Sequence, residues 1–450
     1  MHQEVIAAIS TAPGEGGIAI VRLSGGKSLE VVKNCFQRRK GRFSPRPWRV
    51  YLGDIVDSDG RRIDECLLTF FRAPNSYTGE DVVELGIHGG AFVAGRVLER
   101  LLECGAVLAA PGEFTKRAFL QGRLDLSQAE AVIDVIRANS DVALQNANLH
   151  LRGALTAEIR EAERALLRVL ALIEAQIDFP DMDTPKVTLS EAGAELEAAH
   201  AVLSKLLASA RRGRVVKDGY RVVIVGRPNV GKSSLFNYLA GQERAIVTDI
   251  AGTTRDILEV SLNINGLLVN LLDTAGLRGD GDFIENLGMA RTEQAMLEAD
   301  LLLVLLDGST NLTNEDEALL AKTTTKQRLL VVTKADLPLQ VVLPPAESAI
   351  LVSTVTGGGV VELRETLARE AGRTIGGEHN LLLTNIRHTE SVRRSREATR
   401  AAIEAARTGW ELELVAIDVR QALDYLGEVG GRTISQSLTD EIFTQFCIGK

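Results

Sequence analysis

The stretch GRPNVGKS at residues 226–233 decides the fold of the central part of this chain. It follows the apolar run YRVVIV and precedes LFNYLAG, so the sequence predicts a strand, a glycine-rich turn and a helix in that order. In such a loop the backbone N–H groups surround phosphates, Lys232 neutralises the β and γ phosphates, and the Ser233 hydroxyl can bind Mg²⁺. The stretch predicts an α/β nucleotide-binding domain with a doubly wound parallel sheet.

Two further loops follow in the order expected of switch loops that respond to a γ phosphate. In TDIAGTTRD, residues 248–256, Thr254 is the candidate second ligand of Mg²⁺. In DTAG, residues 273–276, Asp273 can hold a magnesium-bound water and the Gly276 N–H can contact the γ phosphate. The position after DTAG is Leu277, where Ras-like enzymes have a water-orienting glutamine, so another group must orient the water.

The last two loops predict that the base is guanine. TKAD at residues 333–336 ends an apolar run, and the Asp336 carboxylate can accept hydrogen bonds from guanine N1 and N2, which adenine does not offer. Thr333 replaces the usual asparagine and Thr354 in STVTG replaces the usual alanine, so we expect guanine preference with base anchoring left open. The predicted nucleotide contacts are Asn229, Val230, Gly231, Lys232, Ser233, Ser234, Thr248, Asp249, Ile250, Ala251, Gly252, Thr253, Thr254, Asp273, Thr274, Ala275, Gly276, Thr333, Lys334, Ala335, Asp336, Ser353, Thr354 and Val355.

The texture of the chain changes on both sides of this module. Short β-rich runs with Gly, Pro and Asn between them occupy the first part, and Ala, Leu, Glu and Arg at helical spacing follow from residue 124 to residue 212. Helix-like segments resume after residue 385, in a tail that is short for an independent core. We therefore expect an α+β N-terminal domain at 1–118, a discontinuous all-α domain at 119–215 and 375–450, and an inserted Ras-like domain at 216–374.

Composition limits the class of protein. The chain has 450 residues, with 51 Lys and Arg against 60 Asp and Glu, so a net charge of -9 argues against indiscriminate binding to a phosphate backbone. Four cysteines without a CxxC pair argue against a zinc ribbon or a secreted disulfide framework. The sequence shows neither a signal peptide nor a membrane-spanning run, and we expect a cytoplasmic protein without membrane contact.

With its loops in view, the chain resembles the bacterial tRNA-modification GTPase family MnmE, also called TrmE, from end to end. The motifs outside the nucleotide loops are TAPGEGGIAIVRLSG at 11–25, PNSYTGEDVVELGIHGG at 74–90, PGEFTKRAFLQGRLDLSQAEAV at 111–132 and FCIGK at 446–450. The resemblance implies a homodimer that binds GTP or GDP, Mg²⁺, K⁺ and a reduced folate such as 5-formyltetrahydrofolate. It also implies a heterotetramer with an FAD-dependent protein like MnmG (GidA), and aminomethyl-type modification of C5 of the tRNA wobble uridine.

Matched motif by motif, the resemblance assigns site residues. The folate site would use Arg22, Glu84, Arg123 and Lys450. The K⁺ site would use Asn229, Thr248, Ile250 and Thr253. The catalytic residues would be Glu285, Lys232, Arg255 and Cys447.

Two of these assignments have a structural alternative of similar weight. From the sequence alone, Glu285 can equally be a solvated acid of the switch segment, and the resemblance is what favours a water-orienting role. Cys447 can be a reactive thiol or a small packed side chain, because the sequence places no His or Lys directly beside it to activate the thiol. A second class of function is a regulatory GTPase of ribosome or RNA assembly without folate chemistry, which would have no need of the Arg22, Glu84 and CIGK motifs.

Overall fold

The computed structural model describes residues 4–39, 41, 43–178, 189–242, 258–273, 292–344, 347–376, 381–408 and 412–450. The chain divides into two compact units. The first comprises residues 1–133, 150–200 and 394–450, and the second comprises residues 134–149 and 201–393. Helices α4 (Leu126–Arg137), α5 (Asp141–Leu151), α7 (Leu189–Ala208) and α13 (Ile386–Thr408) each contribute residues to both units.

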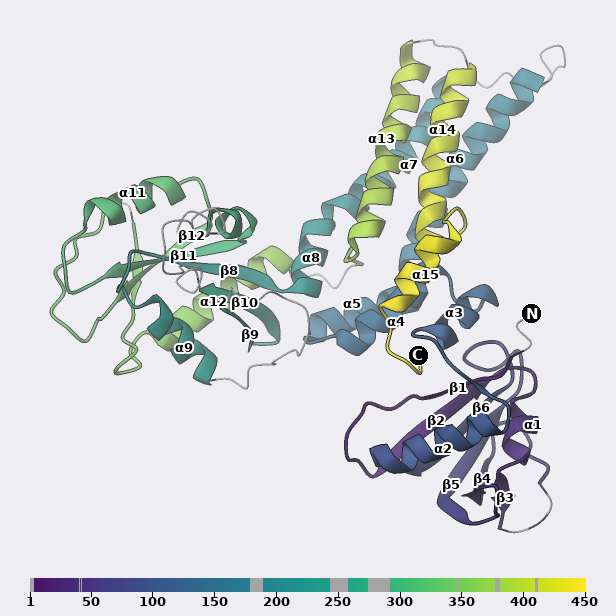
Figure 1. Ribbon diagram of the computed structural model, residues 1–450. Helices are drawn as coiled ribbons and strands as arrows, with labels where there is room; N and C mark the ends of the chain where they lie inside the picture. Colours follow the sequence, from purple (N-terminus) through teal and green to yellow (C-terminus); the bar gives the residue numbers. More distant parts are fainter. Residues whose placement is uncertain are drawn as a thin grey trace, which may run out of the picture. The chain divides into compact units, whose positions relative to one another are not determined.

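A seven-stranded sheet in the order β3-β4-β5-β6-β2-β1-β7 organises the N-terminal part of the first unit (Figure 1). Neighbouring strands are antiparallel except for β1 and β7, which are parallel. Buried and exposed side chains alternate along β5, which leaves one sheet face to pack on the core. The strands are β1 Ile6–Ile9, β2 Ile18–Ser24, β3 Phe36–Arg38, β4 Val50–Val56, β5 Arg62–Phe71, β6 Val82–His88 and β7 Val107–Leu108.

Helices of the first unit cover that sheet and form a separate helical part. Helix α2 (Ala91–Glu103) lies across β1, β2, β5 and β6, where its buried residues Ala94, Val97 and Leu101 follow the helical period. Helix α6 (Ala154–Asp178) packs on α14 (Leu412–Gly430), and its buried stripe includes Leu155, Ile159, Leu166, Val169 and Ile173. The remaining helices are α1 Ser28–Lys33, α3 Glu113–Leu120 and α15 Gln436–Thr444.

Close backbone contacts fix the C-terminal segment against this unit. Gly112, just before α3, has φ +68, and a Cβ at this position would lie 2.5 Å from the Phe443 carbonyl oxygen. Gly449 has φ +92, and a Cβ there would lie 2.4 Å from the carbonyl oxygen of Ile9 in β1. Only glycine fits either position, so the CIGK tail docks beside the first strand.

The second unit contains a six-stranded sheet in the order β13-β12-β11-β8-β10-β9, with every neighbouring pair parallel except β10 and β9 (Figure 1). All seven residues of β11 are buried, as expected for a central parallel strand covered on both faces. The strands are β8 Tyr220–Val225, β9 Leu258–Ile264, β10 Leu267–Asp273, β11 Leu301–Asp307, β12 Arg328–Thr333 and β13 Ala349–Leu351.

Helices α8 (Ala210–Asp218), α9 (Lys232–Gln242), α11 (Asn314–Thr323) and α12 (Val360–Ile375) accompany this sheet. A reciprocal capping box between Thr313 and Asp316 starts α11. The predicted fold class, α+β and helical parts with an α/β nucleotide-binding domain, is confirmed. The boundaries of the three expected domains stay a prediction. Among the described helices, none is long and apolar enough to cross a membrane.

Candidate functional sites

The predicted phosphate-binding loop lies where the sequence places it, between β8 and α9. Asn229 and Gly231 have φ values of 61° and 101°, a left-handed backbone that curls the loop back toward the start of α9. The Lys232 ammonium donates to the carbonyl oxygens of Gly226 and Arg227 at 2.9 and 2.8 Å. These bonds hold the charge over the loop, where phosphate oxygens would meet the ammonium and the N-terminus of α9.

Two predicted magnesium-site residues converge at the same end of the sheet. Asp273, the last residue of β10, is fully buried and accepts a 2.9 Å hydrogen bond from the Ser233 hydroxyl. A hydroxyl and a carboxylate in contact fit Mg²⁺, since this ion takes oxygen ligands directly or through water. Ser233 would bind the ion directly and Asp273 would hold one of its waters.

Hydroxyl groups make the main contacts of the two loops that are predicted to read guanine. Thr333 takes the place of the usual asparagine, and its hydroxyl lies 2.6 Å from the Val230 carbonyl oxygen and 3.1 Å from that of Leu306. Thr333 therefore joins the predicted base-reading loop to the predicted phosphate-binding loop. The Ser353 hydroxyl donates to the Asp336 carboxylate at 2.6 Å and accepts from the Val355 N–H at 3.3 Å.

Asp307, at the end of β11, contacts both the loop at 333–336 and the loop at 226–233. Its carboxylate accepts from the Lys334 ammonium at 2.6 Å and from the Ser309 hydroxyl at 2.6 Å, and it pairs with Arg227 at 3.6 Å. Burial alone would raise the pKa of Asp307, but the hydrogen bonds from Lys334 and Ser309 outweigh it and lower this pKa below its ordinary value. The sequence offers no motif for Asp307 beyond its place after an apolar strand.

Part of the predicted nucleotide site lies outside the described residues. This part includes the first switch loop and the second switch loop after Asp273, with the candidate second Mg²⁺ ligand, three of the four K⁺ ligands and two catalytic candidates. The residues are Thr248, Asp249, Ile250, Ala251, Gly252, Thr253, Thr254, Arg255, Thr274, Ala275, Gly276 and Glu285. Of the predicted K⁺ ligands only Asn229 is described, and it is exposed.

In the first unit, Arg22 and Glu84 form an ion pair between neighbouring strands. They stand directly opposite each other on β2 and β6, and Arg22 Nε and Nη2 lie 2.9 and 2.8 Å from Glu84 Oε1. The guanidinium also lies over the rings of Tyr77 and Phe114, 5.3 and 5.7 Å from their centroids. The two side chains are at most one-quarter exposed, so their charges are largely removed from water. The exposed part leaves them accessible to a ligand.

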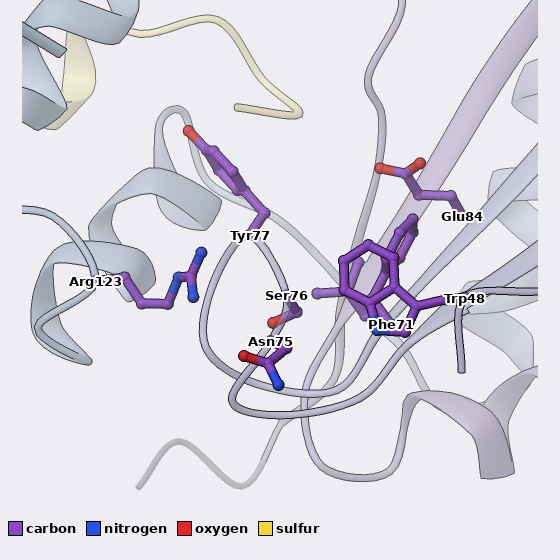
Figure 2. Close-up of a pocket in the computed structure, with 8 residues that line it drawn as sticks. Trp48, Phe71, Asn75, Ser76, Tyr77, Glu84 and Arg123 are labelled. Carbon is purple, nitrogen blue, oxygen red and sulfur yellow. The ribbon is translucent and has the colours of Figure 1, made fainter. Parts of the chain in front are cut away.

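A pocket of about 510 Å³ opens beside this pair (Figure 2). Glu84 and Arg123, two of the predicted folate residues, lie on opposite sides of it in Figure 2. The Arg123 guanidinium donates to the Pro74 carbonyl oxygen at 3.3 Å. Burial raises the pKa of Tyr77, and its hydroxyl lies 2.8 Å from that of Thr115. The lining residues are Trp48, Phe71, Asn75, Ser76, Tyr77, Val82, Glu84 and Arg123.

The C-terminal tail reaches the same ion pair through its backbone. The Gly449 carbonyl oxygen lies 3.4 Å from Arg22 Nη1 and accepts from the Ser10 hydroxyl at 3.0 Å. The Lys450 carbonyl oxygen accepts from the Phe114 N–H at 3.2 Å, which fixes the last residue beside α3. Cys447 is a free, exposed thiol. Thus Glu84 and Arg123 line the pocket and Arg22 pairs with Glu84, whereas Lys450 contacts Phe114 through its backbone and does not line the pocket.

Sequence reasoning missed the aromatic side of this pocket. Trp48 and Phe71 line it, with ring centroids 5.0 Å apart and planes at 87°. Tyr77 lies inside the motif at 74–90, so its place there could have suggested a role. Trp48 carries no such signal, because it lies in an irregular arginine-rich segment.

Comparison with known proteins covers the whole chain. A family model described as the MnmE helical domain matches residues 126–447, and one described as the GTP-binding protein TrmE N-terminus matches residues 5–123. The tRNA modification GTPase MnmE of Symbiobacterium thermophilum is 46% identical over 459 residues, covering 100% of both chains. The protein of that name from Moorella thermoacetica is 44% identical over 464 residues, again covering 100% of both chains.

Among solved structures, a point variant of Aquifex aeolicus Era bound to GDP.AlF4- is similar over 40% of this chain and 66% of that chain. The sequence identity is 25% and the TM-score is 0.28.

Proposed function

This chain belongs to the MnmE family of tRNA modification GTPases, and from that membership we propose the reaction that its two sites serve. The chain works with an FAD-dependent partner like MnmG to install a carboxymethylaminomethyl or aminomethyl group at C5 of the tRNA wobble uridine. A reduced folate, 5-formyltetrahydrofolate or a relative, supplies the one-carbon unit. A homodimer of this chain joins the flavoprotein in a heterotetramer.

The Arg22–Glu84 pair beside the 510 Å³ pocket is the observation that carries the folate part of this proposal. A pteridine offers adjacent ring N–H donors that a carboxylate such as Glu84 can accept from. The aromatic rings of Trp48 and Phe71 offer apolar surface for a flat ring system. Arg123 supplies a cation across the pocket for the acidic end of the ligand.

In the nucleotide site the residues of this chain position GTP and its leaving group. The loop at 226–233 and Lys232 hold the phosphates, and Asp336 selects guanine. Mg²⁺, held by Ser233 and through water by Asp273, would supply charge neutralisation between the β and γ phosphates when bound. Thr254 is proposed as the second metal ligand, and Glu285 as the residue that orients the attacking water.

No arginine finger is proposed for the charge that gathers in the transition state. We propose instead that Asn229 and the segment 248–253 would hold a K⁺ ion, which would supply positive charge for the β and γ phosphates and favour the pairing of two nucleotide domains. Turnover of GTP in KCl and NaCl at equal ionic strength tests this step. Because an arginine finger contributes about three to five decades in rate, equal turnover in both salts would refute a K⁺ mechanism.

Titration with 5-formyltetrahydrofolate by calorimetry tests the function as a whole. Binding to the parent protein, with loss in both Arg22→Ala and Glu84→Ala, supports a folate-dependent modification protein. Arg62→Ala is the matched control, because Arg62 is exposed on the same sheet and does not line the pocket. A folded parent that binds GTP but no reduced folate would favour the second candidate, a regulatory GTPase of RNA assembly.

A further inference from the structure

A second cavity in the first unit has no role in the function proposed above. Its volume is about 780 Å³, and four arginines contribute to its wall: Arg38, Arg39, Arg46 and Arg49. We call it the arginine groove. Among the described residues no acidic side chain lines it, although the whole chain carries a net charge of -9. Four cations around one hollow of an acidic protein are a local feature that selects for a polyanion.

Two of the four arginines are engaged within the protein. Arg39 pairs with Glu65 and with Asp54, whose Oδ1 lies 3.0 Å from Arg39 Nη2. The Arg38 guanidinium lies 4.9 Å from the centroid of the Tyr51 ring, and the Tyr51 hydroxyl accepts a 2.8 Å hydrogen bond from the Arg46 N–H. These contacts fix the shape of the groove.

Arg46 and Arg49 are the two arginines that remain for a ligand. Both are exposed, and within the part of the chain that the structure describes no carboxylate pairs with either. A guanidinium presents a planar fork that matches a carboxylate bidentately, so this pair is suited to repeated carboxylates on a flexible chain.

Two consecutive residues line the first pocket and the arginine groove. Trp48 lines the 510 Å³ pocket and the next residue, Arg49, lines the arginine groove, so their Cα atoms are about 3.8 Å apart. The Trp48 N–H donates to the Phe70 carbonyl oxygen at 2.9 Å, and Trp48 has φ +63, a left-handed conformation that is uncommon for a bulky residue. This anchored turn puts consecutive residues at two neighbouring hollows.

We propose that the arginine groove binds the oligo-γ-glutamate tail of a reduced folate whose pteridine occupies the first pocket. The inference rests on the proposed function, because it names the form of the folate that the same site takes. Each γ-linked glutamate adds one carboxylate, and Arg46 and Arg49 bind these carboxylates one after another. The phosphodiester backbone of RNA is the competing polyanion; adjacency to a pocket for a flat ring favours the folate tail.

The test compares 5-formyltetrahydrofolate as monoglutamate and as pentaglutamate by calorimetry on the full chain. Because single exposed ion pairs contribute little and two or more act together here, we expect the pentaglutamate to bind about tenfold more tightly. Arg46→Ala with Arg49→Ala should abolish this gain and leave monoglutamate affinity unchanged. The lysine pair at the same positions should keep part of the gain, since it keeps the charge without the fork.

The matched control is Arg61→Ala with Arg96→Ala, which removes the same charge from two exposed positions of the same unit outside both hollows. This variant should keep the full gain, and the gain should shrink with added salt in the parent. Equal affinity for the two folates in the parent overturns the inference and leaves the proposed function standing. Failure of the parent to bind either form overturns both. Loss of tRNA affinity in the Arg46 and Arg49 variant, with the pentaglutamate gain intact, assigns the groove to RNA and overturns the inference.

Discussion

At the scale of single residues, Thr333 shows how a departure from a common motif is accommodated. Asparagine is usual at this position, and the sequence alone leaves open how firmly the base is anchored. The threonine hydroxyl lies 2.6 Å from the Val230 carbonyl oxygen, inside the phosphate-binding loop. Thr333 is buried, so its hydroxyl has no solvent to compete for that bond. A short side chain thus joins the predicted base-reading and phosphate-binding loops.

Replacing Thr333 with valine keeps the shape of the side chain and removes the donor. An unsatisfied buried acceptor costs about 1–3 kcal/mol, so we expect GDP to bind about tenfold more weakly. Thr333→Ser retains the hydroxyl and should bind GDP close to the parent. Fluorescent GDP titration measures both affinities, and parent-like binding by the valine variant would show that the loops are held together by other contacts.

The cysteines provide a second residue-scale prediction because their environments differ. Burial raises the pKa of Cys66 to about 12, and the neighbouring carboxylates of Asp64, Asp54 and Glu65 contribute to this increase. At pH 8 almost none of the Cys66 thiol is in the reactive thiolate form. Cys447, in contrast, is exposed to reagents in solution.

Iodoacetamide at pH 8 should therefore label Cys447 in the folded protein and Cys66 only after unfolding. The rate at Cys66 should increase as pH rises toward 12, since that is where its thiolate forms. Peptide mass spectrometry at timed intervals gives each rate. Rapid labelling of Cys66 in folded protein at pH 8 would contradict the buried environment.

At the scale of elements, the sequence predicts much of the secondary structure but little of which helices and strands contact each other. The apolar run at 301–306 predicts a buried parallel strand, and β11 is one, because full burial on both faces leaves a continuous apolar pattern. The Arg22–Glu84 pair needs strand register, since these residues are 62 positions apart and meet only when β2 and β6 align. Trp48 was missed because irregular segments carry no periodicity from which to infer their neighbours.

The C-terminal tail is an element whose docking depends on one glycine. In Gly449→Ala the added Cβ would meet the Ile9 carbonyl oxygen at 2.4 Å with φ at +92, so the tail must move away from β1. We expect the Ser10 and Arg22 contacts to be lost and folate affinity to fall about tenfold or more, because Arg22 loses one of its partners.

Gly430→Ala is the matched control, since a Cβ there meets nothing within 4 Å and the residue ends helix α14. Its folate affinity and melting temperature should match or slightly exceed those of the parent. Amide hydrogen exchange at residues 447–450 reports the docking directly. Slow exchange in the Gly449 variant at the level of the parent would show that the tail tolerates the side chain.

At the scale of the whole molecule, the two candidate sites belong to different compact units. Residues 22, 84, 123 and 447–450 lie in the first unit, and the described nucleotide residues from 226 to 355 lie in the second. The changes of texture along the chain predict this separation. These changes do not predict that residues 134–149 belong to the second unit. The contact that places them there joins Asn146 to Leu382, which is 236 positions away in the sequence.

Separate units predict that each site can be removed while the other is kept. Asp336→Asn reverses the hydrogen-bonding pattern offered to guanine, since the amide donates where the carboxylate accepts, so preference should move from GTP to XTP. The ratio of GTP affinity to XTP affinity should change by about two decades or more, because guanine would then face a polar group that does not match its hydrogen-bonding pattern. Its affinity for 5-formyltetrahydrofolate should stay that of the parent.

Arg22→Ala should show the reverse, with folate binding lost and GTP binding unchanged, because Arg22 and the described nucleotide residues belong to different units. Calorimetry of both variants with both ligands gives four affinities. If Asp336→Asn keeps its GTP preference, TKAD is not the base-reading loop. If either variant lowers the affinity for both ligands equally, the two sites are not independent, and a defect in folding accounts for both losses.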